Sequence, residues 1–352
     1  MGTLFQKQVD HFTKQLPFVV FCKPNLNQII GVFQHNDALH TISDYTENGF
    51  AFVSFDSTQK YFIPQESSDV YVETIDTTEY YLPKTVDLSY SEEAKSDFEQ
   101  LVAKGVKAIV DGNFDKLVLS RKETLLLPSF DIESTFRKFV QLYPTAFKYC
   151  WYHPKVGLWM GATPEQLIKK HSNSIATVAL AGTQLYSESV VWEAKEQQEQ
   201  VFVTDYIVDN LKDFAKDIQV STPYTFQAGS ICHIKTDIRA ELKATTDFGS
   251  CLERLHPTPA VCGLPKLVAQ QFIIKEEGYD RGMYAGFLGE LNVDFATYKR
   301  ETSDLFVNLR CMEMEGNQAN LYVGCGITKD SIPEKEFLET VNKSMTMKRC
   351  IL

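Results

Sequence analysis

Short apolar runs, separated by Asn, Asp, Gly and Pro, dominate the first 90 residues. Each run has the length of a single strand, and the runs lie at 17–24, 28–34, 49–55, 60–64 and 69–75. Their close spacing predicts antiparallel strands that follow one another in a meander. We therefore expect residues 1–90 to be rich in β-structure.

The pattern changes at Ser91, which precedes Glu92 and Glu93. A serine followed by acidic residues is typical of a helix N-terminus, and this helix should run to the turn at Asp111-Gly112-Asn113. Beyond the turn, apolar patterning predicts strands at 116–127, 147–153, 156–162, 174–183, 283–294, 305–313 and 319–327. Further helices are predicted at 134–143, from KEQQEQ through Phe214, and at the C-terminal end.

Strands and helices do not alternate regularly in this order, which argues against a parallel sheet. The predicted fold class is α+β, with large antiparallel β-sheets packed as a sandwich and helices on the outside. With 352 residues, of which 44% are apolar, the chain could form one large domain or two ordinary ones.

Two of the predicted helices carry pairs of carboxylates with i,i+3 spacing. Glu196 and Glu199 form one pair, Glu336 and Glu339 form the other, and Lys343 continues the second line one turn later. Residues at this spacing lie about 5–6 Å apart on one helix face. Such pairs can simply be solvated helix faces, but four acids on two helices also suggest a site for a hard cation.

The residues that follow the first pair favour an inward-pointing face. Val203 and Ile207 continue the line of Glu196 and Glu199, so that face is apolar where it is not acidic. Buried carboxylates need a metal ion, another cation or a proton. Because the segments offer oxygen ligands and no H-E-x-x-H or E-x-x-H motif, Mg²⁺ fits better than zinc or a di-iron centre.

The net charge of −11, without a run of Lys or Arg, excludes nucleic acid and anionic membranes as expected partners. An anionic ligand must therefore be held by local cations. The first residues lack a signal-peptide pattern and no 18 consecutive apolar residues occur, so we expect a cytoplasmic protein. The eight cysteines show no C-x-x-C pair, which favours free thiols.

Ten segments, taken in order, resemble the chorismate-utilising enzymes: isochorismate synthases, salicylate synthases, and the large subunits of anthranilate and aminodeoxychorismate synthases. They are FDKLVLSRK, GATPEQL, ALAGT, KEQQEQ, HIKTDIRAEL, LHPTPAVCGLPK, GYDRGMYAG, NLRCMEME, LYVGCGI and PEKEFLETVNK. The resemblance covers roughly residues 93–348. It implies a variable N-terminal part, residues 1–90, packed on the same fold as a chorismate-binding catalytic region, residues 91–352.

The resemblance implies where a substrate and Mg²⁺ would bind. Mg²⁺ would bridge Glu199 and Glu339 to the ring carboxylate of chorismate, with Glu196 and Glu336 in supporting positions. The enolpyruvyl carboxylate would meet Arg310, whose planar fork suits a carboxylate. The other residues implied in substrate binding are Ala181, Gly182, Thr183, Ala260, Tyr284, Gly324, Gly326 and Lys343.

The resemblance also implies the groups that move protons. Lys116 would be the general base that activates water for attack on ring carbon 2, and its pKa would have to fall from about 10.4 toward roughly 7–8. Glu165 would be the general acid for the departing hydroxyl on carbon 4, which requires a raised pKa. From the residues alone, Lys116 could equally be a surface lysine and Glu165 a helix N-terminal carboxylate.

Of three further positions, Ala181 and Ala260 narrow the choice of reaction within the family. His233 matches an active-site histidine, with an orienting role. Ala181 stands where aminodeoxychorismate synthases carry a nucleophilic lysine, and Ala260 stands where salicylate and anthranilate synthases typically present threonine. These positions favour an isochorismate synthase, an isomerase that acts as a monomer without a glutaminase subunit. A salicylate synthase, an aminating large subunit and a non-catalytic chorismate-binding protein stay as alternatives, and the pathway, menaquinone or siderophore synthesis, stays open.

Overall fold

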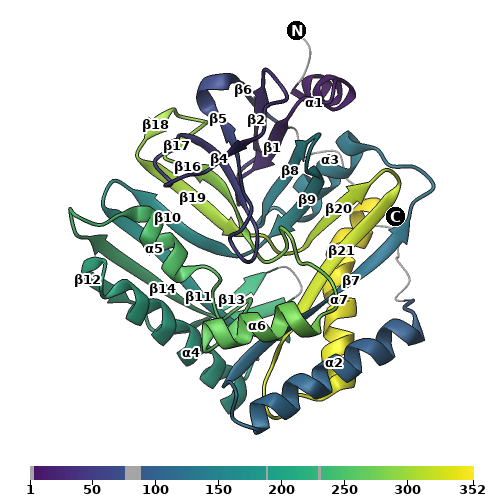
Figure 1. Ribbon diagram of the computed structural model, residues 1–352, viewed down its shortest axis with the longest axis vertical. Helices are drawn as coiled ribbons and strands as arrows, with labels where there is room; N and C mark the ends of the chain where they lie inside the picture. The colour runs from purple at the N-terminus through teal and green to yellow at the C-terminus, as the bar shows by residue number, and fades with distance from the viewer. Residues whose placement is uncertain (1–3, 76–88, 188, 229–230) are drawn as a thin grey trace.

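Two large antiparallel sheets form the body of the computed structural model, which describes residues 4–75, 89–187, 189–228 and 231–352 (Figure 1). Over these residues sheet A has nine strands, in the order β15 (Gly263–Leu264), β7 (Lys116–Leu126), β21 (Gln318–Ile327), β20 (Cys311–Glu315), β9 (Gly157–Thr163), β8 (Phe147–His153), β1 (Phe18–Cys22), β2 (Gln28–Gln34) and β6 (Ser68–Thr74).

Sheet B has ten strands over the same described ranges. Nine of them are hydrogen-bonded in the order β12 (Ala215–Val220), β14 (Ile231–Leu242), β11 (Ser174–Leu185), β10 (Gln166–His171), β19 (Thr302–Val307), β16 (Phe287–Leu291), β4 (Gly49–Val53), β5 (Lys60–Pro64) and β3 (His40–Thr41). The tenth, β13 (Tyr224–Ala228), pairs with β14. A small hairpin joins β17 (Val293–Asp294) and β18 (Lys299–Arg300).

Helices pack on both sheets. On sheet A lie α1 (Leu4–Thr13), α2 (Glu92–Val110), α3 (Ile132–Leu142), α6 (Lys266–Glu276) and α7 (Pro333–Ile351); α4 (Ala194–Leu211) lies on sheet B with α5 (Phe248–Leu255) beside it, and a short 3₁₀ turn spans Gln65–Ser67. Figure 1 shows α2 and α7 next to each other on sheet A. Within the described ranges, no helix has the length and apolarity needed to cross a membrane.

The strand β1 shows why these apolar runs become sheet. Val19 and Phe21 point into the core between the sheets, whereas Phe18, Val20 and Cys22 point to the core beneath α1 and α3. Because both faces are covered, the run FVVFC is continuously apolar instead of alternating.

Aromatic side chains join the two sheets across the inner core. Phe147 of sheet A stacks on Phe306 of sheet B with ring centroids 4.3 Å apart, and Phe21 meets Phe50 at 5.2 Å. The two sheets therefore pack face to face, with helices on their outer surfaces. This arrangement confirms the predicted α+β class with large antiparallel sheets.

Strands from the first 75 residues are built into both sheets. β1 pairs with β8, and β2 and β6 continue sheet A to its edge. β4 pairs with β16, and β5 and β3 continue sheet B. The chain passes from sheet A to sheet B and back to sheet A as it forms these strands, so both sheets depend on this segment.

Two of the places where the chain crosses between the sheets lie side by side. It leaves β9 and enters β10 through Pro164 and Glu165, and it returns from β19 to β20 through residues 308–310. The Val307 amide donates to the Glu165 carbonyl at 2.9 Å, and the Ala162 amide donates to the Arg310 carbonyl at 3.0 Å. Glu165 and Arg310 are thus held on neighbouring crossings.

Most of the predicted elements are confirmed, and the differences have physical reasons. Ser91 caps α2 by accepting a hydrogen bond from the Ala94 amide. The single strand predicted at 305–313 is wrong, because the chain bends at Asn308, whose buried amide bonds Tyr149 and the Met283 carbonyl. The strand predicted at 283–294 begins only at Phe287, since residues 281–286 form turns.

Candidate active site

A cavity of about 160 Å³ lies where the two crossings meet α4, α7 and the ends of β7, β11 and β21. Fifteen of the predicted site residues line it: Lys116, Glu165, Ala181, Gly182, Glu196, Glu199, His233, Ala260, Tyr284, Arg310, Gly324, Gly326, Glu336, Glu339 and Lys343. The remaining one, Thr183, lies in β11, and its side chain is outside what the structure describes.

Lys116 is the first residue of β7 and is 4% exposed, so it is not a surface lysine. Its partner in β15 is Leu264, and in β21 Gly326 pairs with Val118, two residues further along β7. A methyl group at Gly326 would lie 3.6 Å from Lys116 Cε, so the lysine chain passes over the backbone of β21. The β7–β21 register is regular here, which excludes a bulge at Gly324 or Gly326.

Glu165 is 9% exposed and belongs to a crossing, not to a helix N-terminus, because β10 begins at the next residue. Burial raises the pKa of the Glu165 carboxyl to about 7, although Lys116, Arg310 and Lys343 oppose the rise with their positive charges. A carboxyl with this pKa is partly protonated at neutral pH and can deliver a proton. The direction of this shift is the one that a general acid requires.

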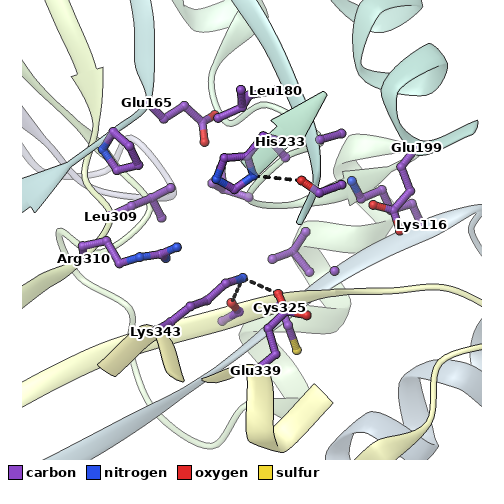
Figure 2. A pocket seen from close by; sticks show the side chains of 18 of the residues that line it. Lys116, Glu165, Leu180, Glu199, His233, Leu309, Arg310, Cys325, Glu339 and Lys343 are labelled. Atoms are coloured by element: carbon purple, nitrogen blue, oxygen red, sulfur yellow. Dashed lines mark hydrogen bonds and ion pairs between the residues drawn. The ribbon is translucent and has the colours of Figure 1, made fainter. Parts of the chain in front are cut away.

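Arg310 has a main-chain φ of +48°, a conformation that a non-glycine side chain adopts rarely. The hydrogen bond from Ala162 holds it there, in the crossing and not within a strand as predicted. Figure 2 shows the Arg310 side chain reaching into the cavity, with Glu165, His233 and Lys343 around it. Backbone strain at a cavity wall commonly marks a functional position.

Two glycines let other groups approach the cavity. A methyl group at Gly324 would lie 2.7 Å from the Leu119 carbonyl oxygen and 2.8 Å from Tyr284 Oη, so no side chain fits there. Gly182 has a φ of +67°, and a methyl group there would lie 3.0 Å from Glu196 Cβ. The absence of side chains therefore lets Tyr284 and the first turn of α4 come close to the strands.

His233 of β14 is fixed by a hydrogen bond between its Nδ1 and the Gly182 carbonyl at 2.8 Å. Burial lowers the pKa of the imidazole to about 4, so the ring is neutral at pH 7. Since a carbonyl can only accept, Nδ1 carries the proton and Nε2 has the lone pair. This tautomer suits an orienting role better than the donation of a proton.

The four carboxylates reach the cavity from two helices, Glu196 and Glu199 from α4 and Glu336 and Glu339 from α7. They are not simply solvated helix faces. Lys343 Nζ lies 2.6 Å from Glu339 Oε1 and donates to the Gly324 carbonyl at 2.8 Å.

The positions of the carboxylate oxygens show whether this cavity could hold the predicted Mg²⁺. Glu196 Oε2 is buried and has no hydrogen-bond partner among the residues that the structure describes. Across the same residues, no three His, Cys, Asp or Glu side chains are close enough to hold a metal as they stand. Mg²⁺ usually takes one or two carboxylates, with water and an anionic ligand completing its shell. The oxygen-rich lining and the buried Glu196 oxygen fit such an ion.

Six residues outside the predicted set complete the lining: Val118, Pro164, Leu180, Val261, Leu309 and Cys325. Most are apolar and look like ordinary core positions in the sequence. Each directly neighbours a predicted site residue in the sequence or lies two positions away, and this closeness is the one sequence feature that could have identified them. Burial raises the pKa of the Cys325 thiol well above its usual range, so this thiol is not a nucleophile at neutral pH.

Comparisons with known proteins agree with the motifs. A family model described as chorismate binding enzyme matches residues 52–352. The isochorismate synthase MenF of Escherichia coli K12 is 30% identical over 261 residues, 71% of this chain and 59% of that protein. An anthranilate synthase component 1 of Archaeoglobus fulgidus is 28% identical over 270 residues, 73% of this chain and 63% of that protein. The chain thus spans about three fifths of the length of these relatives.

Solved structures share the fold over nearly the whole chain. A putative 2,3-dihydroxybenzoate-specific isochorismate synthase, DhbC of Bacillus anthracis, has a TM-score of 0.79 at 22% identity and covers 99% of both chains. The menaquinone-specific isochorismate synthase MenF of Escherichia coli also has a TM-score of 0.79 at 22% identity, covering 96% of this chain and 89% of the other. With the family model matched over most of the chain, this protein belongs to the chorismate-binding enzymes.

Proposed function

We propose that the protein is an isochorismate synthase, which converts chorismate reversibly to isochorismate. The observation that carries the proposal is the placement of buried Lys116 and buried Glu165 on the wall of one cavity, with the Glu165 pKa raised to about 7. A water-for-hydroxyl exchange needs a base for the incoming water and an acid for the departing hydroxyl.

In the proposed reaction, Lys116 takes a proton from water as the water oxygen bonds to ring carbon 2. The ring double bonds shift, the bond between carbon 4 and its hydroxyl breaks, and Glu165 gives that oxygen a proton. The product therefore has the composition of the substrate. His233, kept neutral by its burial and fixed in place by its hydrogen bond to the Gly182 carbonyl, would orient the hydroxyl as a hydrogen-bond acceptor.

The two carboxylates of chorismate need separate partners. Arg310, Tyr284 and the backbone at Gly326 are proposed for the enolpyruvyl carboxylate, and Arg310 is well suited because its guanidinium can bind both oxygens. Mg²⁺, held by Glu199 and Glu339 with Glu196 and Glu336 in support, would supply the positive charge that the ring carboxylate needs among four acids. Lys343 adds a further cation at this end.

The nearest alternative is a salicylate synthase, which also releases pyruvate. Ala260, on the cavity wall, presents only a methyl group where the resemblance associates threonine with further reactions. The similarity to an anthranilate synthase component 1 favours a second candidate, an aminating enzyme. Lys116 argues against that candidate, and we propose action as a cytoplasmic monomer without a glutaminase subunit. One similar structure is named for menaquinone and the other for 2,3-dihydroxybenzoate, so the proposal does not choose between the menaquinone and siderophore pathways.

A product assay tests the proposal. Purified protein is incubated with chorismate and Mg²⁺, with and without ammonium, and the products are separated by chromatography. Isochorismate as the dominant product is expected. Salicylate with pyruvate, or an ammonium-dependent aminated product, would replace our assignment by one of the alternatives.

Two further arms of the assay address the proposed roles. Lys116→Gln should abolish turnover while Mg²⁺ binding, measured by calorimetry, is largely retained. Chelation of the metal should weaken chorismate binding itself, because the four acids repel a dianion. Turnover by the Lys116 variant would remove this residue from the mechanism.

A further inference from the structure

The edge of β7 next to the cavity is only partly covered by a strand. β15 pairs with it through Gly263 and Leu264, and the last ladder bond runs from the Val118 amide to the Cys262 carbonyl at 2.7 Å. The chain before Cys262 then turns away, because the amides of Val261 and Cys262 both donate to Thr258. Beyond the last ladder bond, β7 and the chain before Cys262 diverge and no longer bond each other. The carbonyls of Val118 and Val261 lie at this point and need other donors.

One guanidinium supplies donors to both carbonyls. Arg281 donates to the Val118 carbonyl at 2.8 Å and to the Val261 carbonyl at 2.9 Å. Glu277 accepts from the Ser120 amide at 2.7 Å. Val118 and Ser120 are two residues apart, so they direct their backbone groups to the same edge of the sheet. Arg281 and Glu277 therefore occupy the hydrogen-bonding positions of a missing strand.

The two side chains also bind each other away from water. Arg281 Nε donates to Glu277 Oε2 at 2.7 Å, and their side chains are 3% and 0% exposed. The Arg281 guanidinium carbon lies 4.4 Å from the centre of the Phe55 ring, which covers it. A buried ion pair is weak evidence for stability, because desolvation offsets most of its attraction. The planar fork with fixed donor directions gives a better reason for an arginine here.

The segments that this pair joins both form cavity wall. Val118 and Val261 line the cavity, Lys116 lies two residues before Val118, and Ala260 directly precedes Val261. We propose that Arg281 and Glu277 are positioning residues, which fix the strand that carries the base relative to the loop that carries Ala260. The expected effect on kcat rests on the proposed function. The expected effect on the relative position of the two segments rests on the structure alone.

Two variants and one control separate positioning from stability. Arg281→Lys keeps the charge, but its three donors lie on one nitrogen and cannot replace the four hydrogen bonds that Arg281 makes from three nitrogens. The double variant Arg281→Met with Glu277→Leu removes both buried charges at similar volume, so the fold should be retained while both carbonyls lose their donor. The matched control is Lys23→Arg, another charge-preserving change in a buried ion pair, 2.6 Å from Glu290 and outside the cavity lining.

The first measurement is amide hydrogen exchange of segments 116–120 and 258–263, which needs no activity. We expect faster exchange in both segments for Arg281→Lys and for the double variant, and wild-type exchange there for Lys23→Arg. Unchanged exchange in both Arg281 variants would overturn the proposal, whatever the protein does to chorismate.

The second measurement is steady-state kinetics with chorismate. We expect kcat to fall by about tenfold or more in both Arg281 variants, with KM changed less than about threefold, because misplacing the base affects the reaction more than binding. Wild-type kcat in a folded double variant, as judged by its melting temperature, would overturn the positioning role. If the wild-type protein does not convert chorismate, the proposed function fails, and the exchange result alone decides whether the pair holds the two segments.

Discussion

The ammonium of Lys343 lies 2.6 Å from Glu339 Oε1, one turn earlier on α7. A carboxylate proposed as a direct Mg²⁺ ligand is thus paired with a cation of its own chain. The same ammonium donates to the Gly324 carbonyl, so the contact is held from a second side. A metal ion at Glu339 has to compete with Lys343 for that oxygen.

Replacing Lys343 with Met should therefore strengthen Mg²⁺ binding in the absence of chorismate. We expect the Kd for Mg²⁺ to fall by about fivefold or more, since each 1.4 kcal/mol of lost competition corresponds to a factor of ten. Titration calorimetry, or displacement of Mn²⁺ followed by electron spin resonance, measures it. Lys335→Met, which removes a charge from an exposed position of the same helix, is the control. Weaker Mg²⁺ binding in the Lys343 variant would show that the lysine supports the site.

The pH dependence of the reaction should report Glu165. Its pKa of about 7 means that the acid form is lost as the pH rises through 7, so kcat/KM should fall on the alkaline side with a midpoint near that value. Glu165→Gln should lower kcat by about 10²-fold or more and remove this alkaline limb from the residual activity. Rates at constant Mg²⁺ from pH 5.5 to 9 test this. A wild-type rate that stays level between pH 6 and 9 would contradict the role of Glu165 as general acid.

The site residues that could be predicted from the sequence were ionisable residues that stand in recognisable motifs. The paired glutamates, Lys116 and Glu165 stand out because their types and order match motifs, and they do meet at one cavity. The bend at residues 308–310 could not be predicted from the sequence, because LFVNLRC continues a strand pattern without Gly or Pro. Its cause is Asn308, whose partners Tyr149 and Met283 are distant in the sequence. Contacts of this kind are set by tertiary packing, which local patterns do not encode.

The stability of the protein should also depend on Glu165, with a defined sign. The folded-state pKa is about 7 and the ordinary value is 4.5, so the folded state holds the proton more tightly than the unfolded chain. The contribution of this group to stability is fully present below pH 4.5 and is lost as the pH rises to 7. At pH 8 the buried charge should cost up to about 3 kcal/mol.

Glu165→Gln should consequently unfold at higher denaturant concentration than wild type at pH 8, and the difference should shrink toward pH 4.5. Glu290 also has a buried carboxyl whose pKa is raised to about 7, and it is present in both proteins, so subtracting the two stability curves isolates Glu165. Urea unfolding at several pH values measures the difference. An equal difference at pH 5 and pH 8 would mean that Glu165 does not titrate as proposed.

Gly324 and Gly326 are two residues apart in β21, and the space around them predicts opposite tolerance to alanine. At Gly324 a methyl group would meet the Leu119 carbonyl at 2.7 Å and Tyr284 Oη at 2.8 Å, and the carbonyl belongs to the paired strand and cannot move freely. Gly324→Ala should therefore destabilise the protein by about 1–3 kcal/mol. At Gly326 the nearest atom would be Lys116 Cε at 3.6 Å, an ordinary contact, so Gly326→Ala should change stability by less than about 0.5 kcal/mol.

Thermal and urea unfolding of the two alanine variants give the comparison, and chorismate binding gives a second readout. Because relief of the Gly324 clash would push Tyr284 out of place, Gly324→Ala should also weaken chorismate binding beyond its effect on folding. The double variant Gly324→Ala with Tyr284→Phe removes the hydroxyl from the clash and should recover part of the lost stability. If that double variant is no more stable than Gly324→Ala alone, the strain lies against the Leu119 carbonyl, and Tyr284 is not displaced.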